Sequence, residues 1–274
     1  MLLREIESFL EEDIGHEDYE EIVPYIECKA EITVREDGVL AGLEEAKQIF
    51  DYIGVKYTTE FADGARIKRD DTILTVRGAG AKILKVERLV LNFMGRMSGI
   101  ATLTSMFVHE ARRANAVITV AGTRKTTPGF RKYEKKAIVI GGGDPHRFGL
   151  YEAVIIKDNH IMLMGLENAI KKTKERVSFT RKIEVEVESI EDALRAAELN
   201  VDIIMLDNMP AAEVKECVNL MAERGIRDAL ILEASGGINL TNIKEFAATG
   251  VDVVSSGRLT HSATWLGFSL NVVE

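Results

Sequence analysis

The sequence predicts an α/β fold: a seven-stranded βα-barrel, incomplete but TIM-like, preceded by an N-terminal α+β sandwich domain. Short runs rich in β-branched residues recur between residues 117 and 255, helical patterns separate them, and no reversal signal interrupts the alternation. Strand followed by helix at a spacing of roughly 20–28 residues is typical of βαβ units and a parallel sheet. An open doubly wound sheet would give similar patterns and stays the alternative.

The first part of the chain, residues 1–104, mixes both periodicities. Apolar spacing predicts helices at 3–12, 18–26 and 43–53. From Cys28 the period changes to two, which predicts a half-buried strand; further short strands are expected within 55–61 and 63–80.

Residues 83–114 have helical apolar spacing, and Gly95 and Gly99 lie four residues apart on this helix. That spacing permits close approach of another backbone, although glycine weakens a helix. The tail, 265–274, alternates again and predicts a last strand that packs onto the first domain. We therefore expect one domain of residues 1–104 joined by 265–274, and a catalytic βα domain of residues 105–264.

The second domain is predicted element by element. Its strands are expected at 117–121, 138–140, 154–156, 183–187, 203–206, 230–234 and 251–255. The clearest helices between them are expected at 166–176, 190–199, 211–224 and 239–249.

The predicted strands end in polar or glycine-rich segments, and active groups of parallel βα folds collect at the carboxyl ends of strands. One stretch, 122–160, carries cations beside a glycine run. Cations at strand ends beside flexible turns predict a pocket for a multiply anionic ligand. The strand ends hold Thr123-Arg124-Lys125, Gly141-Gly142-Gly143 before His146-Arg147, Lys157-Asp158, Glu186 and Glu188, Asp207-Asn208, Ser235-Gly236-Gly237, and Ser256-Gly257.

Glu184, Glu186 and Glu188 alternate with valines, so strand geometry places the three carboxylates on one face. Buried carboxylates need cations, and Lys125 and Lys157 are the expected partners. Either a structural ion-pair cluster or a ligand- or metal-binding role would account for them.

Two late strand ends, Ser235-Gly236-Gly237 and Ser256-Gly257, suggest a phosphate site, because backbone N–H groups often bind phosphate at that place in barrels. Turns also need glycine, so either pair taken alone is weak evidence.

Composition narrows the function class. Hydrophobic residues make up 46% and charged residues 29% of the 274 residues, as in an ordinary soluble enzyme. The net charge of −9 argues against nucleic acid as the main partner. No apolar run approaches the ~20 residues that cross a bilayer. Residues 1–20 show no signal-peptide pattern, so we expect no membrane partner and a cytoplasmic location.

The central motifs resemble those of the quinolinate phosphoribosyltransferase family. The resemblance covers nearly the whole chain in order, and its motifs are specific. It rests on Thr123-Arg124-Lys125-Thr126-Thr127-Pro128-Gly129, the Gly141–Gly143 run with His146-Arg147, Lys157-Asp158-Asn159-His160, Glu184-Val185-Glu186-Val187, Leu206-Asp207-Asn208, Glu233 to Gly237 and Thr260-His261-Ser262, and upstream on Glu87-Arg88 and Ser98-Gly99-Ile100-Ala101.

The resemblance implies an enzyme that converts quinolinate and phosphoribosyl pyrophosphate into nicotinate mononucleotide, pyrophosphate and CO2 with Mg2+. It implies that the carboxylates of quinolinate are held by Arg124, His146, Arg147 and Lys157. Arg88 would reach in from the neighbouring subunit of a homodimer or higher oligomer.

The resemblance also divides the rest of the site. Lys125 would contact the pyrophosphate side, and Glu186 and Asp207 would meet the ribose hydroxyls or Mg2+. The 5′-phosphate would be bound by the turns that contain Ser235, Gly236, Gly237, Ser256 and Gly257.

The chain departs from the family pattern at two positions. Gly122 stands where Asp usually precedes Thr-Arg-Lys, and Pro145 stands where Asn commonly precedes His-Arg. The first departure removes a carboxylate partner for Arg124 or Lys125, and the second alters a loop beside the carboxylate site.

Other functions stay open. A related branch, associated with molybdenum transport, shares the barrel, but the intact Lys157-Asp158-Asn159-His160 favours the quinolinate enzyme. A Schiff-base lyase with Lys157 as nucleophile and a non-catalytic nucleotide-binding relative are the remaining alternatives.

Overall fold

The computed structural model describes residues 1–15, 23 and 25–273. The chain divides into two compact units, one formed by Met1–Leu103 with Ala263–Glu274 and the other by Thr104–Ser262. The predicted domain boundaries lie within two residues of these.

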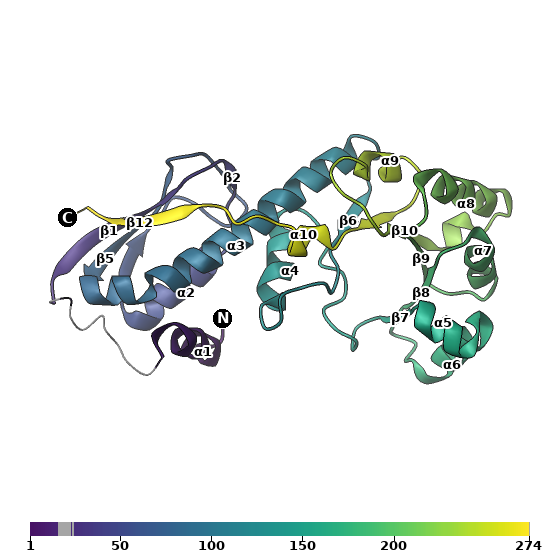
Figure 1. Ribbon diagram of the computed structural model, residues 1–274, viewed down its shortest axis with the longest axis horizontal. Helices are drawn as coiled ribbons and strands as arrows, with labels where there is room; N and C mark the ends of the chain where they lie inside the picture. Colours follow the sequence, from purple (N-terminus) through teal and green to yellow (C-terminus); the bar gives the residue numbers. More distant parts are fainter. Residues whose placement is uncertain (16–22, 24, 274) are drawn as a thin grey trace. The chain divides into compact units, whose positions relative to one another are not determined.

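The first unit is built on a four-stranded antiparallel sheet in the order β12-β1-β5-β3 (Figure 1). The alternation starting at Cys28 is confirmed: Ala30, Ile32 and Val34 of β1 are buried. A second, two-stranded sheet pairs β2 with β4. The strands span β1 Glu27–Val34, β2 Gly38–Val39, β3 Lys56–Thr58, β4 Arg66–Ile67, β5 Thr72–Ala79 and β12 Phe268–Val272.

Helices α1 (Leu3–Ile14) and α2 (Leu43–Ile53) confirm the first and third predicted helices. Most of the predicted helix 18–26 lies outside the described residues. The long helix α3 (Gly80–Arg112) contains residues of both units. Within the first unit it packs against α1 through an edge-to-face contact of Phe93 with Phe9, with ring centroids 5.1 Å apart.

The C-terminal strand β12 pairs antiparallel with β1, with Ile32 opposite Leu270. The sequence prediction that the tail packs onto the first domain is confirmed. Within this strand pair, Thr33 of β1 and Ser269 of β12 are joined by a hydroxyl–hydroxyl hydrogen bond of 3.1 Å. Strands β1 and β12 therefore lie side by side in one sheet, and the chain between them includes the whole second unit.

The glycines of α3 allow the tail to approach the helix closely. A Cβ on Gly99 would lie 1.9 Å from the carbonyl oxygen of Thr264, and one on Gly95 would lie 3.0 Å from that of Leu266. The amide of Leu266 also donates to the carbonyl of Gly95 at 3.0 Å. The predicted close approach of another backbone is confirmed.

We expect Gly99→Ala to lower the free energy of unfolding of the first unit by about 1–2 kcal/mol. Alanine favours a helix by about 1 kcal/mol over glycine, but a contact of 1.9 Å with a backbone oxygen puts the cost of overpacking at the upper end of its range of about 1–3 kcal/mol. Urea unfolding followed by circular dichroism measures the difference. Gly80→Ala is the matched control, because a Cβ there would meet Cys28 Sγ at an ordinary 3.5 Å. An equal or greater stability of Gly99→Ala would contradict the close-packing argument.

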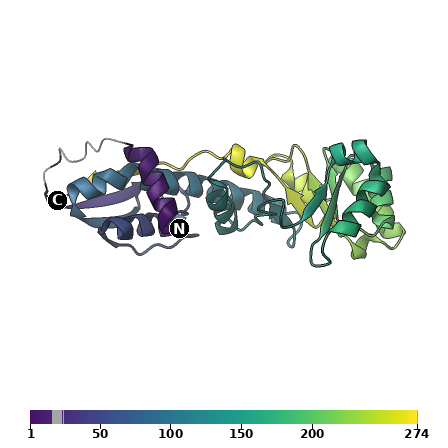
Figure 2. The same cartoon turned by 90° about the horizontal axis from the view of Figure 1, so that it is seen from below.

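The second unit contains a parallel six-stranded sheet in the order β6-β11-β10-β9-β8-β7. In both views α6, α7 and α8 lie along the same outer side of this sheet (Figures 1 and 2). The strands are β6 Thr119–Ala121, β7 Val154–Ile156, β8 Ile183–Val187, β9 Ile203–Asp207, β10 Ile231–Ser235 and β11 Val253–Ser255. The helices are α4 Arg131–Ile140, α5 Asp158–Met164, α6 Leu166–Arg176, α7 Ile190–Glu198, α8 Ala211–Glu223, the short 3-10 helix η2 Arg227–Ala229, α9 Ile243–Ala247 and α10 Arg258–His261.

The predicted strand at 138–140 is wrong, because these residues end helix α4. A run as short as Ala137–Ile140 cannot be distinguished from the buried end of a helix by apolar content alone. Ala137 and Ile138 are buried while Val139 is 52% exposed, the pattern of a helix face. At the start of α4, the buried Glu134 accepts hydrogen bonds from the amide and hydroxyl of Thr127, at 3.0 and 2.9 Å, and thereby ties the helix to the preceding loop.

The predicted seven-stranded barrel is therefore corrected to six strands, and closure is not observed. Strands β6 and β7 are the two edge strands of this sheet. Among the described strands they do not pair with each other, so the sheet is open. Beside β6, a single parallel bridge joins Ala121 to Asp144, just after α4. The chain after α4 therefore pairs with β6 through an isolated bridge, where the sequence predicted a full strand.

Candidate active site

A cavity of about 330 Å³ lies at the carboxyl ends of the six parallel strands. Each strand, or the segment that follows it, contributes to its wall, as the strand-end rule predicts. The lining residues are Gly122, Thr123, Arg124, Lys125, His146, Arg147, Ile155, Lys157, Glu186, Met205, Asp207, Glu233, Ser235 and Ser255. The cavity thus brings together eight of the predicted site residues, namely Arg124, Lys125, His146, Arg147, Lys157, Glu186, Asp207 and Ser235.

Two guanidinium groups line one part of the cavity. Arg147 is 9% exposed and donates from Nη1 to the carbonyl of Ala153 at 2.8 Å. Burial lowers the pKa of Arg147, and the like charge of Arg124 lowers it further. The buried Nε of Arg124 makes no hydrogen bond to the described residues. Two cations held this close suit a ligand with more than one negative charge.

The loop that carries His146 and Arg147 is fastened to helix α4. Lys135 is fully buried and its ammonium donates to the carbonyl of Pro145. The ammonium also lies 5.4 Å from the centre of the Phe148 ring, within cation–π range. Burial lowers the pKa of Lys135 to about 8, and the charge of Arg131 contributes. The loop is therefore fixed at the residue that precedes His146.

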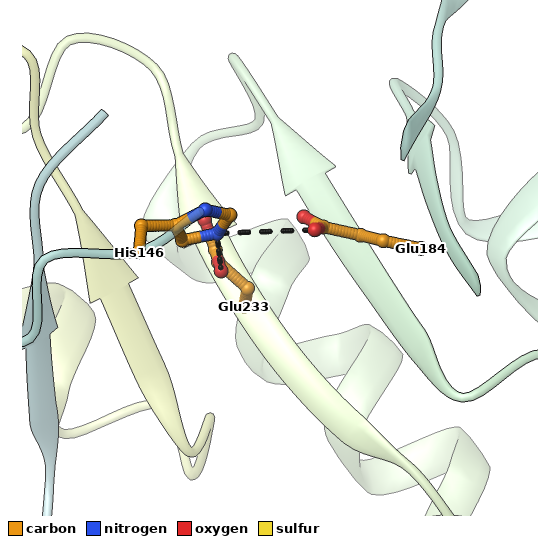
Figure 3. A group of neighbouring side chains, drawn as sticks. All are labelled: His146, Glu184 and Glu233. Atoms are coloured by element: carbon orange, nitrogen blue, oxygen red, sulfur yellow. Dashed lines mark hydrogen bonds and ion pairs between the residues drawn. The ribbon is translucent and has the colours of Figure 1, made fainter. Parts of the chain in front are cut away.

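His146 lies between two buried carboxylates that come from different strands (Figure 3). Its Nε2 is 3.2 Å from Glu233 Oε2, on β10, and 3.8 Å from Glu184 Oε2, on β8. Burial lowers the pKa of His146, but the hydrogen bond and charge of Glu233, with the charge of Glu184, outweigh it and raise the pKa overall. These three side chains form the His146 cluster.

Glu184 is the most deeply buried member of the His146 cluster, with a side chain only 1% exposed. Within the described residues, neither of its oxygens has a hydrogen-bond partner, and the same is true of Glu233 Oε1. Burial and, to a smaller extent, the charge of Glu233 raise the pKa of Glu184 to about 8.

A second carboxylate group lies at the ends of β8 and β9. Lys157 pairs with Glu186 through its ammonium, as the sequence predicts. Asp207 is opposite Ser235 in the register of β9 and β10 and accepts a hydrogen bond from it. Burial raises the pKa of Asp207, while Ser235 and the charges of Lys157 and Lys125 oppose the shift.

The alternating glutamates behave differently from one another. Glu184 and Glu186 point to the cavity side of β8, but Glu188 lies beyond the strand end and is exposed. Of the expected ion pairs with Lys125 and Lys157, only that of Lys157 is present among the described residues.

The two glycine turns do not line the cavity, but they shape it. Gly236 and Gly237 have φ angles of 89° and 66°, in the left-handed region that favours glycine. A Cβ on Gly257 would lie 2.9 Å from Lys125 Cδ, so the glycine leaves room for that lysine. Ser256 donates its hydroxyl to the carbonyl of Ile238, whereas the neighbouring Ser255 lines the cavity.

The remaining predicted site residue, Arg88, is exposed on α3 in the first unit and is not among the lining residues. The sequence argument missed Glu233 and Ser255 as site residues and gave Glu184 no separate role. A glutamate in the middle of the buried run Leu230–Ala234 was the available signal for Glu233, because a charge inside a buried strand needs a partner or a ligand.

Gly122 and Pro145, the two departures from the family pattern, lie close together in the structure. A Cβ on Gly122 would meet Ile138 Cδ1 at 2.5 Å, so a larger residue there would displace this side chain of α4. The carboxylate that the family usually has at this position is absent, in keeping with the unpartnered Nε of Arg124. Pro145 contributes its carbonyl, which any residue would supply, to Lys135.

No helix within the described residues is long and apolar enough to cross a membrane.

Comparison with known proteins follows the division of the chain. Residues 19–98 match the model of the quinolinate phosphoribosyl transferase N-terminal domain, and residues 100–271 match that of the C-terminal domain. A probable nicotinate-nucleotide pyrophosphorylase [carboxylating] of Archaeoglobus fulgidus is 48% identical over 253 residues, 92% of this chain and 97% of that protein. The human nicotinate-nucleotide pyrophosphorylase [carboxylating] is 35% identical over 269 residues, 97% of this chain and 90% of that protein.

Solved structures agree with the sequence relatives. The crystal structure of nicotinate-nucleotide pyrophosphorylase from Ehrlichia chaffeensis superposes with a TM-score of 0.92 at 32% identity, over 100% of this chain and 99% of that one. Both domain models match in order, and they leave only short segments uncovered. The chain belongs to the quinolinate phosphoribosyl transferase family.

Proposed function

We propose that the cavity catalyses transfer of the phosphoribosyl group of phosphoribosyl pyrophosphate to the ring nitrogen of quinolinate. The products are nicotinate mononucleotide, pyrophosphate and CO2, which is a step of NAD biosynthesis, and the protein is a pentosyltransferase. Family membership over both domains and the names of the curated relatives support this function. The single observation that carries it is a cavity at the strand ends that is lined by both cations and carboxylates.

The cationic side suits quinolinate. A planar ring with two adjacent carboxylates needs two anion-binding groups at a fixed angle, and forked guanidinium groups provide them. We assign Arg124, Arg147, His146 and Lys157 to the two carboxylates. Burial of Arg147 and His146 strengthens the attraction, because less water competes for the charges.

The carboxylate side suits the ribose. Departure of pyrophosphate leaves positive charge on the ribose carbon, and fixed carboxylates at Glu186 and Asp207 stabilise that charge without reorganisation. Lys125, beside Asp207, faces the departing pyrophosphate. We assign the 5′-phosphate to the turns with Ser235, Gly236, Gly237, Ser256 and Gly257. Gly236 and Gly237 are left-handed, a conformation in which successive backbone N–H groups can bind an anion.

Glu186 and Asp207 also fit Mg2+. Both offer carboxylate oxygens, the ligands that Mg2+ prefers, and both line the same cavity from neighbouring strands. Burial raises the pKa of Asp207, and a bound cation would oppose that shift. When bound, Mg2+ would neutralise charge on the leaving pyrophosphate.

Loss of CO2 needs little from the protein. Once the ring nitrogen carries the ribose, the ring is electron-poor and the bond to the adjacent carboxylate is weakened. The chain supplies the orientation of the ring through its cations. No covalent nucleophile is required.

Three features of the assembled enzyme stay predictions from the sequence: a homodimer or higher oligomer, completion of the site by Arg88 of the partner subunit, and a cytoplasmic location. The exposure of Arg88 on α3 leaves its guanidinium accessible to such a contact.

The lyase alternative is less well supported by the geometry. Lys157 is held in an ion pair with Glu186, and a Schiff base at its nitrogen would break that pair.

Turnover tests the proposed function directly. Incubation with quinolinate, phosphoribosyl pyrophosphate and Mg2+ should release pyrophosphate and CO2 in equal amounts, with nicotinate mononucleotide as product. Turnover with nicotinate in place of quinolinate would overturn the substrate, and binding without turnover would identify a non-catalytic relative.

A further inference from the structure

The His146 cluster places two buried carboxyl groups, Glu233 and Glu184, beside a site for an anion, although recognition of an anion does not require them. His146 lines the cavity that we assign to a dicarboxylate, yet two buried carboxylates stand behind it, with side chains 1% and 3% exposed. Negative charge beside an anion site weakens binding unless it has another effect. Its effect is exerted on the imidazole.

The two ring nitrogens of His146 are in different situations. Nε2 is 3.2 Å from Glu233 Oε2, and because an ionised carboxylate only accepts hydrogen bonds, we assign the proton of this contact to Nε2. Nδ1 makes no hydrogen bond to the described residues. In a neutral imidazole whose Nε2 is protonated, Nδ1 presents a lone pair, which repels a carboxylate; only the imidazolium has an N–H at both nitrogens.

The charges that face His146 favour the imidazolium. Glu233 from β10 and Glu184 from β8 attract the proton, while Lys135 from α4 opposes it. Lys135 has the smallest effect of these three groups on the pKa of His146. Protonation of His146 also compensates part of the cost of burying two carboxylates that have few other donors.

The backbone fixes the ring in this place. His146 has a φ of 54°, in the left-handed region, and its amide donates to Asp144 Oδ1 at 2.6 Å. Together with the anchored carbonyl of Pro145, these contacts hold the imidazole between Glu184 and Glu233 (Figure 3).

We propose that Glu233, supported by Glu184, is a positioning residue that keeps His146 an imidazolium with its Nδ1–H available to a substrate carboxylate. The proposal rests on the proposed function, because it takes the ligand of His146 to be quinolinate. It makes recognition of the dicarboxylate depend on groups that need not touch it.

The wild-type protein provides the first test. Histidine labelled with 15N in the ring reports protonation at each nitrogen, and the spectrum of His146→Gln identifies the signal. We expect His146 to remain doubly protonated at pH 7, above the usual histidine pKa of about 6.5. A neutral ring at pH 7 would overturn the proposal, whatever the enzyme assay shows.

Glu233→Gln provides the second test, since glutamine keeps the size and removes the charge. We expect the pKa of His146 to fall by about one unit and the KM for quinolinate at pH 8 to rise about tenfold. The KM for phosphoribosyl pyrophosphate should be unchanged, and the defect should shrink towards pH 6, where the imidazole is protonated in both proteins. Glu184→Gln should have a smaller effect, because Glu184 is 3.8 Å from Nε2.

Controls separate this role from simple structural damage. Glu175→Gln changes an exposed glutamate of α6 and should leave both KM values and the histidine signal unchanged. In the His146→Gln background, Glu233→Gln should add little to the KM for quinolinate, because the coupling passes through the imidazole. Equal loss at every pH, or additive effects of the two substitutions, would overturn the proposal.

Two further outcomes are informative. Addition of Zn2+ should leave the His146 signal in place; a Zn2+-dependent shift that Glu233→Gln removes would show a metal site and overturn the proposal. If His146→Gln leaves the KM for quinolinate unchanged, the assigned contact with quinolinate fails, and this failure is visible separately from the protonation state measured in the wild type.

Discussion

Arg147→Ala is expected to raise the KM for quinolinate by about 100-fold and to leave the KM for phosphoribosyl pyrophosphate nearly unchanged. A charge-assisted hydrogen bond to a carboxylate contributes about 1.5–3 kcal/mol, and more when it is shielded from water, and each 1.4 kcal/mol is tenfold in affinity. Arg147 is only 9% exposed, so water competes little for its charge. Initial-rate kinetics with each substrate varied in turn measures both constants.

Two further variants sharpen the assignment of Arg147. Arg147→Lys should fall between the wild type and Arg147→Ala, because lysine keeps the charge but cannot form the guanidinium fork. Arg176→Ala, at the exposed end of α6, should behave as the wild type. Circular dichroism should show all three folded, which matters because Arg147 also donates to Ala153. Equal increases in the KM of both substrates would remove Arg147 from the quinolinate side.

Glu186→Gln is expected to reduce kcat by about 100- to 1000-fold with little change in the KM for quinolinate, the range found when a preorganised electrostatic contact to a transition state is removed. The carboxylate of Glu186 is placed to stabilise charge that exists on the ribose only during transfer. Glutamine removes the charge while keeping the side-chain volume. Single-turnover measurement of pyrophosphate release isolates this step from product release.

Glu188→Gln is the matched control for Glu186→Gln. Glu188 lies two residues further along the same chain segment and is exposed beyond the end of β8. We expect its kcat to remain within about twofold of the wild type, since exposed charges are screened by water and salt. If Glu186→Gln instead raised the KM for quinolinate at unchanged kcat, the role of Glu186 would be limited to orienting Lys157, its ion-pair partner.

Local patterns determined most of the fold. The strands Val154–Ile156 and Ile183–Val187 and the helices Leu43–Ile53 and Leu166–Arg176 have the predicted bounds, because each has a clear period and polar or glycine residues at its ends. The failure at 138–140 has a physical reason. Its three β-branched residues favour a strand locally, but Glu134 ties the start of α4 to Thr127, and the burial of Ala137 and Ile138 depends on the tertiary fold.

The candidate site was predictable where chemistry follows directly from strand ends. Arg124, Lys157, Glu186 and Asp207 each follow or end a strand, and parallel strands end at one edge of a sheet, so their convergence required no coordinates. The sequence could not show that Ser255, and not Ser256, lines the cavity. A shift of one residue moves a side chain to the other face of a strand.

The sequence by itself determined the two-domain organisation, the parallel βα order, the cationic and acidic strand ends, and the resemblance to the family. Only the tertiary structure decided that the sheet has six strands and that His146 lies between Glu184 and Glu233. The two glutamates are 49 residues apart in the sequence, and β9 lies between their strands in the sheet. Periodicity assigns each side chain to a face of its own strand, but which faces share a buried space depends on the register of the whole sheet.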